Sequence, residues 1–192
     1  MEIKNAFLAR LREETMPLHK EVESSVISKA IISPGVTRDE YVTYLSKVLA
    51  IHSDVENTVF PVAGKIIADI EARKKAAFIT ADLLKLTDTN ALTASRFLDA
   101  HYQNDLSFNL GLLYVTEGST LGGQFILKNI RAALGSHAPA GFLNVYGERT
   151  GSMWKAFMAA LQDYEATLNH EGQEQVVAGA LYGFERVKHI FN

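Results

Sequence analysis

The chain has 192 residues, of which 47% are hydrophobic, and its formal net charge at pH 7 is -3. A slightly acidic chain lacks the basic face with which nucleic-acid-binding proteins neutralise phosphates, so we expect no nucleic-acid partner. It contains no cysteine, which excludes disulfides, iron–sulfur clusters and thiolate zinc sites.

The chain has no feature of a secreted or membrane-spanning protein. Its N-terminal segment alternates charged with apolar residues and lacks the continuous apolar core of a signal peptide. No apolar run reaches the roughly 18 residues that a membrane span requires. We therefore expect a cytoplasmic protein with no membrane contact, folded as one domain over residues 1–192.

Amphipathic helices are predicted from the N-terminus onward. Apolar residues recur every three or four positions over about residues 5–27, which indicates a helix that Pro17 bends or weakens. Thr37 and Glu40 have the spacing of a capping box and predict the start of a second helix. Pro61 marks the expected end of that helix or a bend in it.

The remainder of the chain also shows helical patterns and few strand signals. A polar stretch with several glycines, residues 135–151, is expected to be irregular. The sequence thus predicts an all-α, single-domain bundle of seven or eight helices. Its further helices are expected at about 62–74, 91–101, 106–134, 152–169 and 173–191.

A cluster of glycines interrupts the predicted helix over residues 106–134. Gly118, Gly122 and Gly123 lie in the sequence LLYVTEGSTLGGQ, where each glycine destabilises a helix interior by roughly 0.5–1 kcal/mol relative to alanine. At helical spacing Gly111, Gly118 and Gly122 share one face and leave it without side chains. Such a strip accommodates either a flat, bulky ligand or a closely packed neighbouring helix.

Several catalytic motifs fail on individual residues. Gly118 and Gly123 have the spacing of a phosphate-binding loop, but Gln124 and Phe125 replace its lysine and its hydroxyl residue. No Glu has a His three positions later, as a diiron bundle requires, and HExxH is absent. Ser119 does not lie in a GxSxG elbow.

Among six histidines, His19 has the most informative neighbours. Glu23 follows it by one helical turn and Arg12 precedes it by two, so the three side chains lie close together on the first helix. A carboxylate at that spacing can orient a metal-bound imidazole, and an arginine can hold a carboxylate of a large ligand. A salt-bridged, solvent-facing helix surface would show the same three residues.

Two segments taken together resemble a known family. LREETMPLHKEVE resembles the proximal-helix motif of heme oxygenases, and YVTEGSTLGGQ resembles their glycine-rich distal helix. The resemblance extends to YVTYLSKVLAIHSDVE and YGERTGSMWKAFMAAL, so it covers most of the chain. It looks closest to the small bacterial, biliverdin-producing members, and it implies a helical bundle with heme between the first helix and a glycine-kinked distal helix.

The resemblance also implies roles for individual residues. His19 corresponds to the axial iron ligand, Glu23 to the group that orients its imidazole, and Arg12 to a basic position that holds the heme propionates. The remaining implied residues are Lys128 and Arg186 as further propionate partners, Gly118, Gly122 and Gly123 as close backbone contacts of heme, and Ser119, Gly118 and Gly122 as the catalytic distal positions.

In the family, heme b is both cofactor and substrate and is cleaved by O2 and external electrons to biliverdin, carbon monoxide and ferrous iron. The implied electron donor is a ferredoxin or flavodoxin reductase system, or ascorbate in vitro. Ser119 stands where the mammalian-type motif has an aspartate that anchors distal water, and serine offers no charge.

Two alternatives are therefore a non-catalytic heme-binding protein on the same scaffold and a heme-free relative of the thiaminase II type. The absence of cysteine weighs against the second of these. The sequence indicates no oligomeric state.

Overall fold

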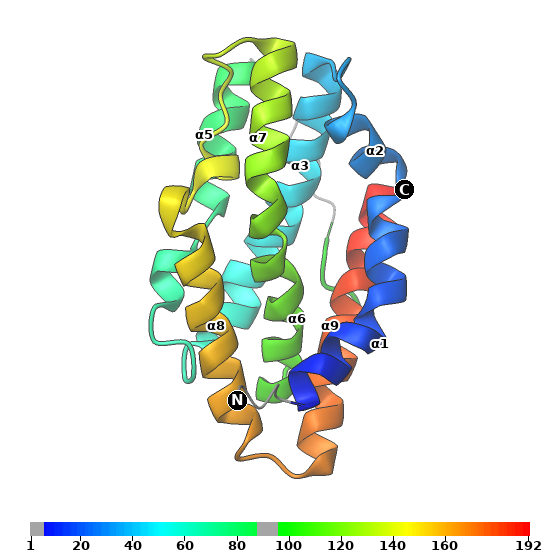
Figure 1. Cartoon of the computed structure of the whole chain (residues 1–192), viewed down its shortest axis with the longest axis vertical. Coiled ribbons are helices and arrows are strands. Elements are labelled where there is room, and N and C mark those ends of the chain that lie inside the picture. Colours follow the sequence, from blue (N-terminus) through cyan, green and yellow to red (C-terminus); the bar gives the residue numbers. More distant parts are fainter. Residues whose placement is uncertain (1–5, 88–95) are drawn as a thin grey trace.

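Helices joined by turns make up the computed structural model, which describes residues 6–87 and 96–192 and has no strand in those ranges. The predicted all-α class is confirmed (Figure 1). The α-helices are α1 (Ala6–Glu23), α2 (Val26–Ile32), α3 (Arg38–Asp54), α4 (Phe60–Ala63), α5 (Ala76–Leu86), α6 (Leu106–Gly118), α7 (Thr120–Leu134), α8 (Thr150–Glu165) and α9 (His170–Phe191).

The first predicted helix is divided at two serines. α1 continues through Pro17 but ends at Glu23, short of the predicted residue 27. The Ser25 side chain accepts a hydrogen bond from the backbone N–H of Ser28 and caps α2, which therefore begins as a separate helix. Serine hydroxyls compete with the helix for backbone partners, and the apolar periodicity does not reveal that competition.

The second predicted helix begins as expected. The Thr37 side chain accepts a hydrogen bond from Glu40 N, and the Glu40 carboxylate accepts one from Thr37 N at 2.7 Å, which completes the capping box. After α3 the chain forms a π-helical turn, Val55–Val59, and Pro61 lies in the short α4 that follows. Proline lacks the N–H that a regular helix would use, so the change of helix type next to it has a clear cause.

The predictions for residues 62–101 are largely wrong. Residues 62 and 63 end α4, the stretch from 64 to 74 forms turns and a short 3₁₀ helix, Ile70–Arg73, and the helix that follows, α5, was not predicted. Part of the predicted helix at 91–101 lies outside the described residues, and residues 96–101 are not helical. There the Asp54 carboxylate accepts hydrogen bonds from Phe97 N and Leu98 N, at 2.7 and 3.0 Å, in place of helical carbonyls.

The glycine-bearing segment forms two successive helices, α6 and α7, with Ser119 at the break between them. The last two predicted helices are confirmed as α8 and α9. Residues 135–149 contain only short 3₁₀ turns, Phe142–Asn144 and Gly147–Arg149, and the last two residues of the predicted irregular stretch belong to α8. The first of these turns is held by the Asp82 carboxylate of α5, which accepts from Gly141 N and Phe142 N.

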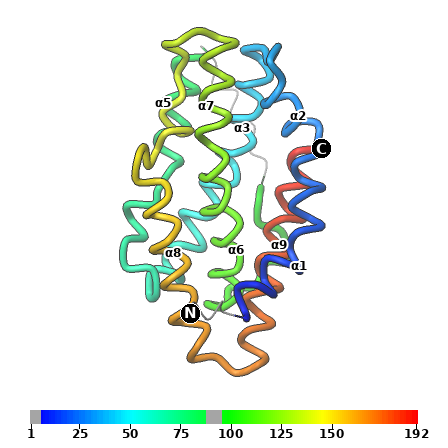
Figure 2. Tube along the Cα trace, viewed as in Figure 1, coloured from blue at the N-terminus to red at the C-terminus, as the bar shows by residue number. Residues whose placement is uncertain are grey.

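α6 and α9 pack with their backbones almost in contact. A Cβ atom on Gly111 would lie 1.9 Å from the carbonyl oxygen of Val176, and one on Gly179 would lie 1.9 Å from that of Phe108. α9 also packs along α1, so the first and the last helix of the described chain lie side by side (Figure 2). The α6–α7 segment runs lengthwise beside this pair, and α2 lies across one end (Figure 1).

Among the helices of residues 6–87 and 96–192, none has the length and apolar character of a membrane-crossing segment.

Candidate functional site

His19 and Glu23 form a pair on the outer part of α1. Nδ1 of His19 lies 3.6 Å from Oε1 of Glu23, and the two side chains are 49% and 67% exposed. The imidazole meets the ring of Phe184 edge to face, with centroids 5.6 Å apart. Phe184 comes from α9 and is buried, so it forms a fixed support for the imidazole. Nε2 of His19 has no hydrogen-bond partner in the described part of the chain and is available to a ligand.

Arg12 lies two turns before His19 and is exposed, with no ion pair to any described carboxylate. An open surface depression of about 600 Å³ adjoins it, but that depression is lined by residues of α1 alone and does not include His19. The depression therefore does not connect Arg12 with His19 or with the α6–α7 segment.

The α6–α7 segment contacts the α1–α2 side of the molecule at two positions, Tyr114 and Asn129. Burial raises the pKa of Tyr114 on α6, while the Thr15 hydroxyl and the Arg12 charge on α1 lower it, which places Tyr114 beside α1. Farther along, the Asn129 side chain of α7 donates to the carbonyl oxygens of Ile31 and Ser33, at 3.0 and 2.8 Å. The two contacts define one face of the α6–α7 segment.

Gly118 and Gly122 lie between these contacts. Positions 114, 118, 122 and 129 recur at helical spacing and therefore share one side of the segment. On the other wall, His19 lies in sequence between Thr15 and α2. At this spacing His19 lies on the same side of α1 as Thr15, which contacts the α6–α7 segment at Tyr114.

The glycines of this segment have different surroundings. A Cβ atom on Gly122 would meet nothing within 4 Å, whereas one on Gly118 would lie 3.5 Å from the Trp154 ring. A Cβ atom on Gly123 would lie 3.0 Å from the carbonyl oxygen of Leu143, so this glycine accommodates the Phe142–Asn144 turn. Because Gly111 accommodates α9, the strip contacts a neighbouring helix at one end and is open at Gly122.

Exposed apolar and basic side chains adjoin the open glycine. Leu121 and Phe125 are 48% and 65% exposed, which is unusual for large apolar side chains that follow one another on a helix. Lys128 is exposed one turn farther along. A flat apolar ligand with acidic edges would cover the first two and reach the third, so the residues present fit heme.

Ser119 is exposed, and its hydroxyl donates to the carbonyl oxygen of Thr116 at 2.8 Å. Its proton is thereby engaged within the helix. The hydroxyl oxygen retains lone pairs and still accepts a hydrogen bond from water.

Arg186 has another function in this structure. Its Nε donates to the carbonyl oxygen of Phe97 at 2.7 Å, its Nη2 donates to that of Arg96 at 3.1 Å, and its Nη1 pairs with Asp99 at 3.0 Å. The guanidinium therefore anchors the segment around residues 96–99 to α9. The geometry gives no support to Arg186 as a propionate partner.

The sequence analysis missed a buried charge cluster behind the distal turn. Glu117 lies immediately before Gly118. Its carboxylate accepts hydrogen bonds from Arg73 Nη1 at 2.6 Å and from Lys75 Nζ at 2.5 Å. The Tyr146 hydroxyl donates to the same carboxylate at 3.0 Å. Both cations are 1% exposed, and burial lowers the pKa of Lys75 despite its acidic partner. The only sequence signal is an acid within the apolar run LLYVTEG, which does not identify its partners.

Comparison with known proteins gives one family. A family model described as Heme oxygenase matches residues 5–192. No protein in the curated set that was compared matches the chain.

Three solved structures of heme oxygenases are similar to this chain. That of Leptospira interrogans has a TM-score of 0.80 at 16% identity, with 97% of this chain and 98% of that chain covered. The NO- and CO-bound protein of Neisseria meningitidis gives 0.74 at 23%, with 96% and 89% covered. That of the cyanobacterium Synechocystis, in complex with heme, gives 0.78 at 16%, with 97% and 90% covered. At these identities the likeness shows a common fold.

Proposed function

We propose that this chain, which belongs to the heme oxygenase family, binds heme b between α1 and the α6–α7 segment and cleaves it with O2 and external electrons to biliverdin, carbon monoxide and ferrous iron. The observation that carries the proposal is the arrangement of the two walls. The proposal is supported by a half-exposed imidazole with an available Nε2 on α1 and by Gly122 on α7, which has nothing within 4 Å of its Cβ position.

On the proximal side, His19 would supply Nε2 as the iron ligand. Glu23, whose Oε1 lies 3.6 Å from Nδ1, would accept a hydrogen bond from Nδ1 in the ligand-bound protein, which favours the tautomer with Nε2 free to ligate and increases its basicity. Phe184 supports the imidazole from α9 and restricts its rotation. Arg12 and Lys128, both exposed, would bind the acidic edge of the ligand.

On the distal side, the open space at Gly122 lets the backbone approach a flat ring, and Leu121 and Phe125 offer apolar contact. Ser119 would accept a hydrogen bond from a distal water, since its own proton is engaged by Thr116. Bound heme supplies the iron centre that activates O2 and the macrocycle that is cleaved.

A second candidate function is heme binding without cleavage. The observation in its favour is that Ser119 brings no charge and has already donated its proton to a carbonyl. We further propose that the chain acts in the cytoplasm as one domain over residues 1–192, with a ferredoxin or flavodoxin reductase system as its electron donor.

Titration of the protein with hemin, followed by ascorbate or a ferredoxin reductase system under oxygen, tests the proposal. A Soret band that then disappears while the broad red absorption of biliverdin grows supports the oxygenase. A stable oxy complex supports heme binding alone. If hemin produces no Soret shift, both functions are wrong.

A further inference from the structure

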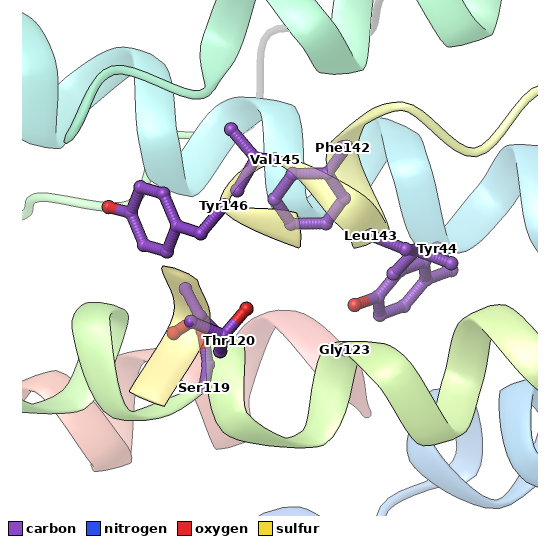
Figure 3. A pocket seen from close by; sticks show the side chains of 9 residues that line it. Tyr44, Ser119, Thr120, Gly123, Phe142, Leu143, Val145 and Tyr146 are labelled. Carbon is purple, nitrogen blue, oxygen red and sulfur yellow. The ribbon is translucent and has the colours of Figure 1, made fainter. Parts of the chain in front are cut away.

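A small cavity lies behind the turn between α6 and α7. It is bounded by Tyr44 from α3, by Ser119, Thr120 and Gly123 of the turn and α7, and by the segment that contains Tyr146 (Figure 3). Its volume of about 20 Å³ exceeds the roughly 10–15 Å³ that one water molecule requires. The cavity therefore has room for one small molecule.

The Tyr44 hydroxyl is an unsatisfied donor in this cavity. Tyr44 is 8% exposed, and its ring packs against Tyr41 and Phe191. Its oxygen points into the space before Thr120 and Gly123 (Figure 3) and has no hydrogen-bond partner among residues 6–87 and 96–192. Burial raises the pKa of Tyr44, so the hydroxyl keeps its proton. Among the described residues the hydroxyl oxygen is not one of the fully buried, unpartnered side-chain atoms, so solvent in the cavity reaches it and supplies its hydrogen-bond partner.

The other hydroxyls that line the cavity have already donated their protons. Ser119 donates to Thr116 O, Thr120 to Glu117 O and Thr150 to Gly147 O, at 2.7–2.8 Å. Their oxygens remain acceptors. The walls thus offer one donor and several acceptors, and the matching ligand both accepts and donates hydrogen bonds. Water meets this requirement, whereas a diatomic gas has no proton to donate.

We propose that this cavity binds one water molecule, which accepts a hydrogen bond from Tyr44 Oη and donates to the hydroxyl oxygens of the Ser119–Thr120 turn. The water ties α3 to the break between α6 and α7. The site itself is independent of the proposed function. The role of Tyr44 in heme cleavage rests on that function. Because Ser119 would face the bound ligand, Tyr44 is a positioning residue that acts through water on the turn between α6 and α7.

High-resolution crystal structures and amide hydrogen exchange of the ligand-free protein test the site. We expect density for one water within hydrogen-bond distance of Tyr44 Oη in the wild type and its loss in Tyr44→Phe. The amides of residues 119–123 should exchange about tenfold faster in that variant, because one tie on the turn is removed.

Tyr41→Phe is the matched control. Tyr41 is a buried tyrosine of the same helix, but its hydroxyl donates to the carbonyl oxygen of Pro139 at 2.9 Å. Tyr41→Phe should leave the cavity water and the exchange of residues 119–123 unchanged. If it accelerated that exchange as much as Tyr44→Phe, a general loosening of α3 would explain the result and the proposal would be wrong.

Two other outcomes would overturn the proposal. One is a wild-type cavity with no water density, or one that binds xenon under pressure as apolar cavities do. The other is water density that persists unchanged in Tyr44→Phe. Both readouts use protein without heme, so a failure to bind or cleave heme would refute the proposed function and leave this test intact.

Discussion

Nδ1 of His19 lies 3.6 Å from Oε1 of Glu23, and a second pair with the same spacing, Nε2 of His170 and Oε1 of Glu174, lies at 3.7 Å on α9. The two pairs look alike in sequence. They differ in their surroundings, because His19 packs against the buried Phe184 of α9, whereas His170 is 83% exposed at the start of α9. The second pair is therefore a natural control for the first.

His19→Ala should reduce the rate of heme cleavage by about 100-fold or more, because the axial ligand sets the reactivity of the iron. The folded state should change by less than about 0.5 kcal/mol, since the side chain is half exposed. Hemin should still bind, more weakly and with a shifted Soret maximum. Soret titration, turnover with ascorbate and urea unfolding measure the three effects. His170→Ala should cleave heme at the wild-type rate. If the two variants cleaved heme equally fast, His19 would not be the axial ligand.

Two glycine-to-alanine variants should separate fold from function. Gly111→Ala places a Cβ 1.9 Å from a backbone carbonyl of α9, so we expect a loss of about 3 kcal/mol in the free energy of unfolding. Gly122→Ala meets nothing and should leave stability unchanged or raise it by up to about 1 kcal/mol. The same variant should weaken hemin binding. Undiminished hemin affinity in Gly122→Ala would show that this face is not the ligand wall.

The sequence predicted those parts of the fold that depend on local patterns. The capping box at Thr37 and Glu40 and the periodicity of α8 and α9 involve neighbouring residues, so they are visible without tertiary contacts. The failure over residues 62–101 has the opposite cause. There Asp54 provides the backbone partners of Phe97 and Leu98 from a distant position in the chain, and no local pattern indicates such a contact.

The candidate site shows the same division. Motif resemblance selected His19 and Glu23, which the structure pairs on α1, and Gly118 and Gly122, which lie beside the break between α6 and α7; their joint role stays a prediction. It could not show that Arg186 holds backbone carbonyls, since the pairing of an arginine depends on the tertiary fold.

Loss of the Glu117 carboxylate should destabilise the protein strongly. In Glu117→Gln two buried cations, Arg73 and Lys75, lose their common anionic partner, and removal of one member of a buried pair typically destabilises by about 3–5 kcal/mol. Glu71→Gln is the control, because Glu71 is 76% exposed and pairs with Lys74 at the surface. Its effect should stay below about 1 kcal/mol. Urea unfolding of both variants without heme measures the difference, and similar values would mean that the cluster contributes little.

The buried His52 should make stability fall in mildly acidic solution. Burial, with the nearby charge of Lys75, lowers the pKa of His52 well below 6.5 in the folded state. In the unfolded chain the pKa is about 6.5, so below that pH the unfolded state binds a proton that the folded state does not, and stability falls by up to about 1.4 kcal/mol per pH unit. His52→Leu removes the titrating group.

The stability of the wild type relative to His52→Leu should therefore decrease by about 1 kcal/mol between pH 7 and pH 5.5. Chemical unfolding of both proteins across this range measures that difference directly, and the contributions of carboxylates, which titrate mainly at lower pH, largely cancel in it. His137→Leu, at an exposed position of the irregular segment, is the control variant. A constant difference between the wild type and His52→Leu would show that His52 is protonated in the folded protein.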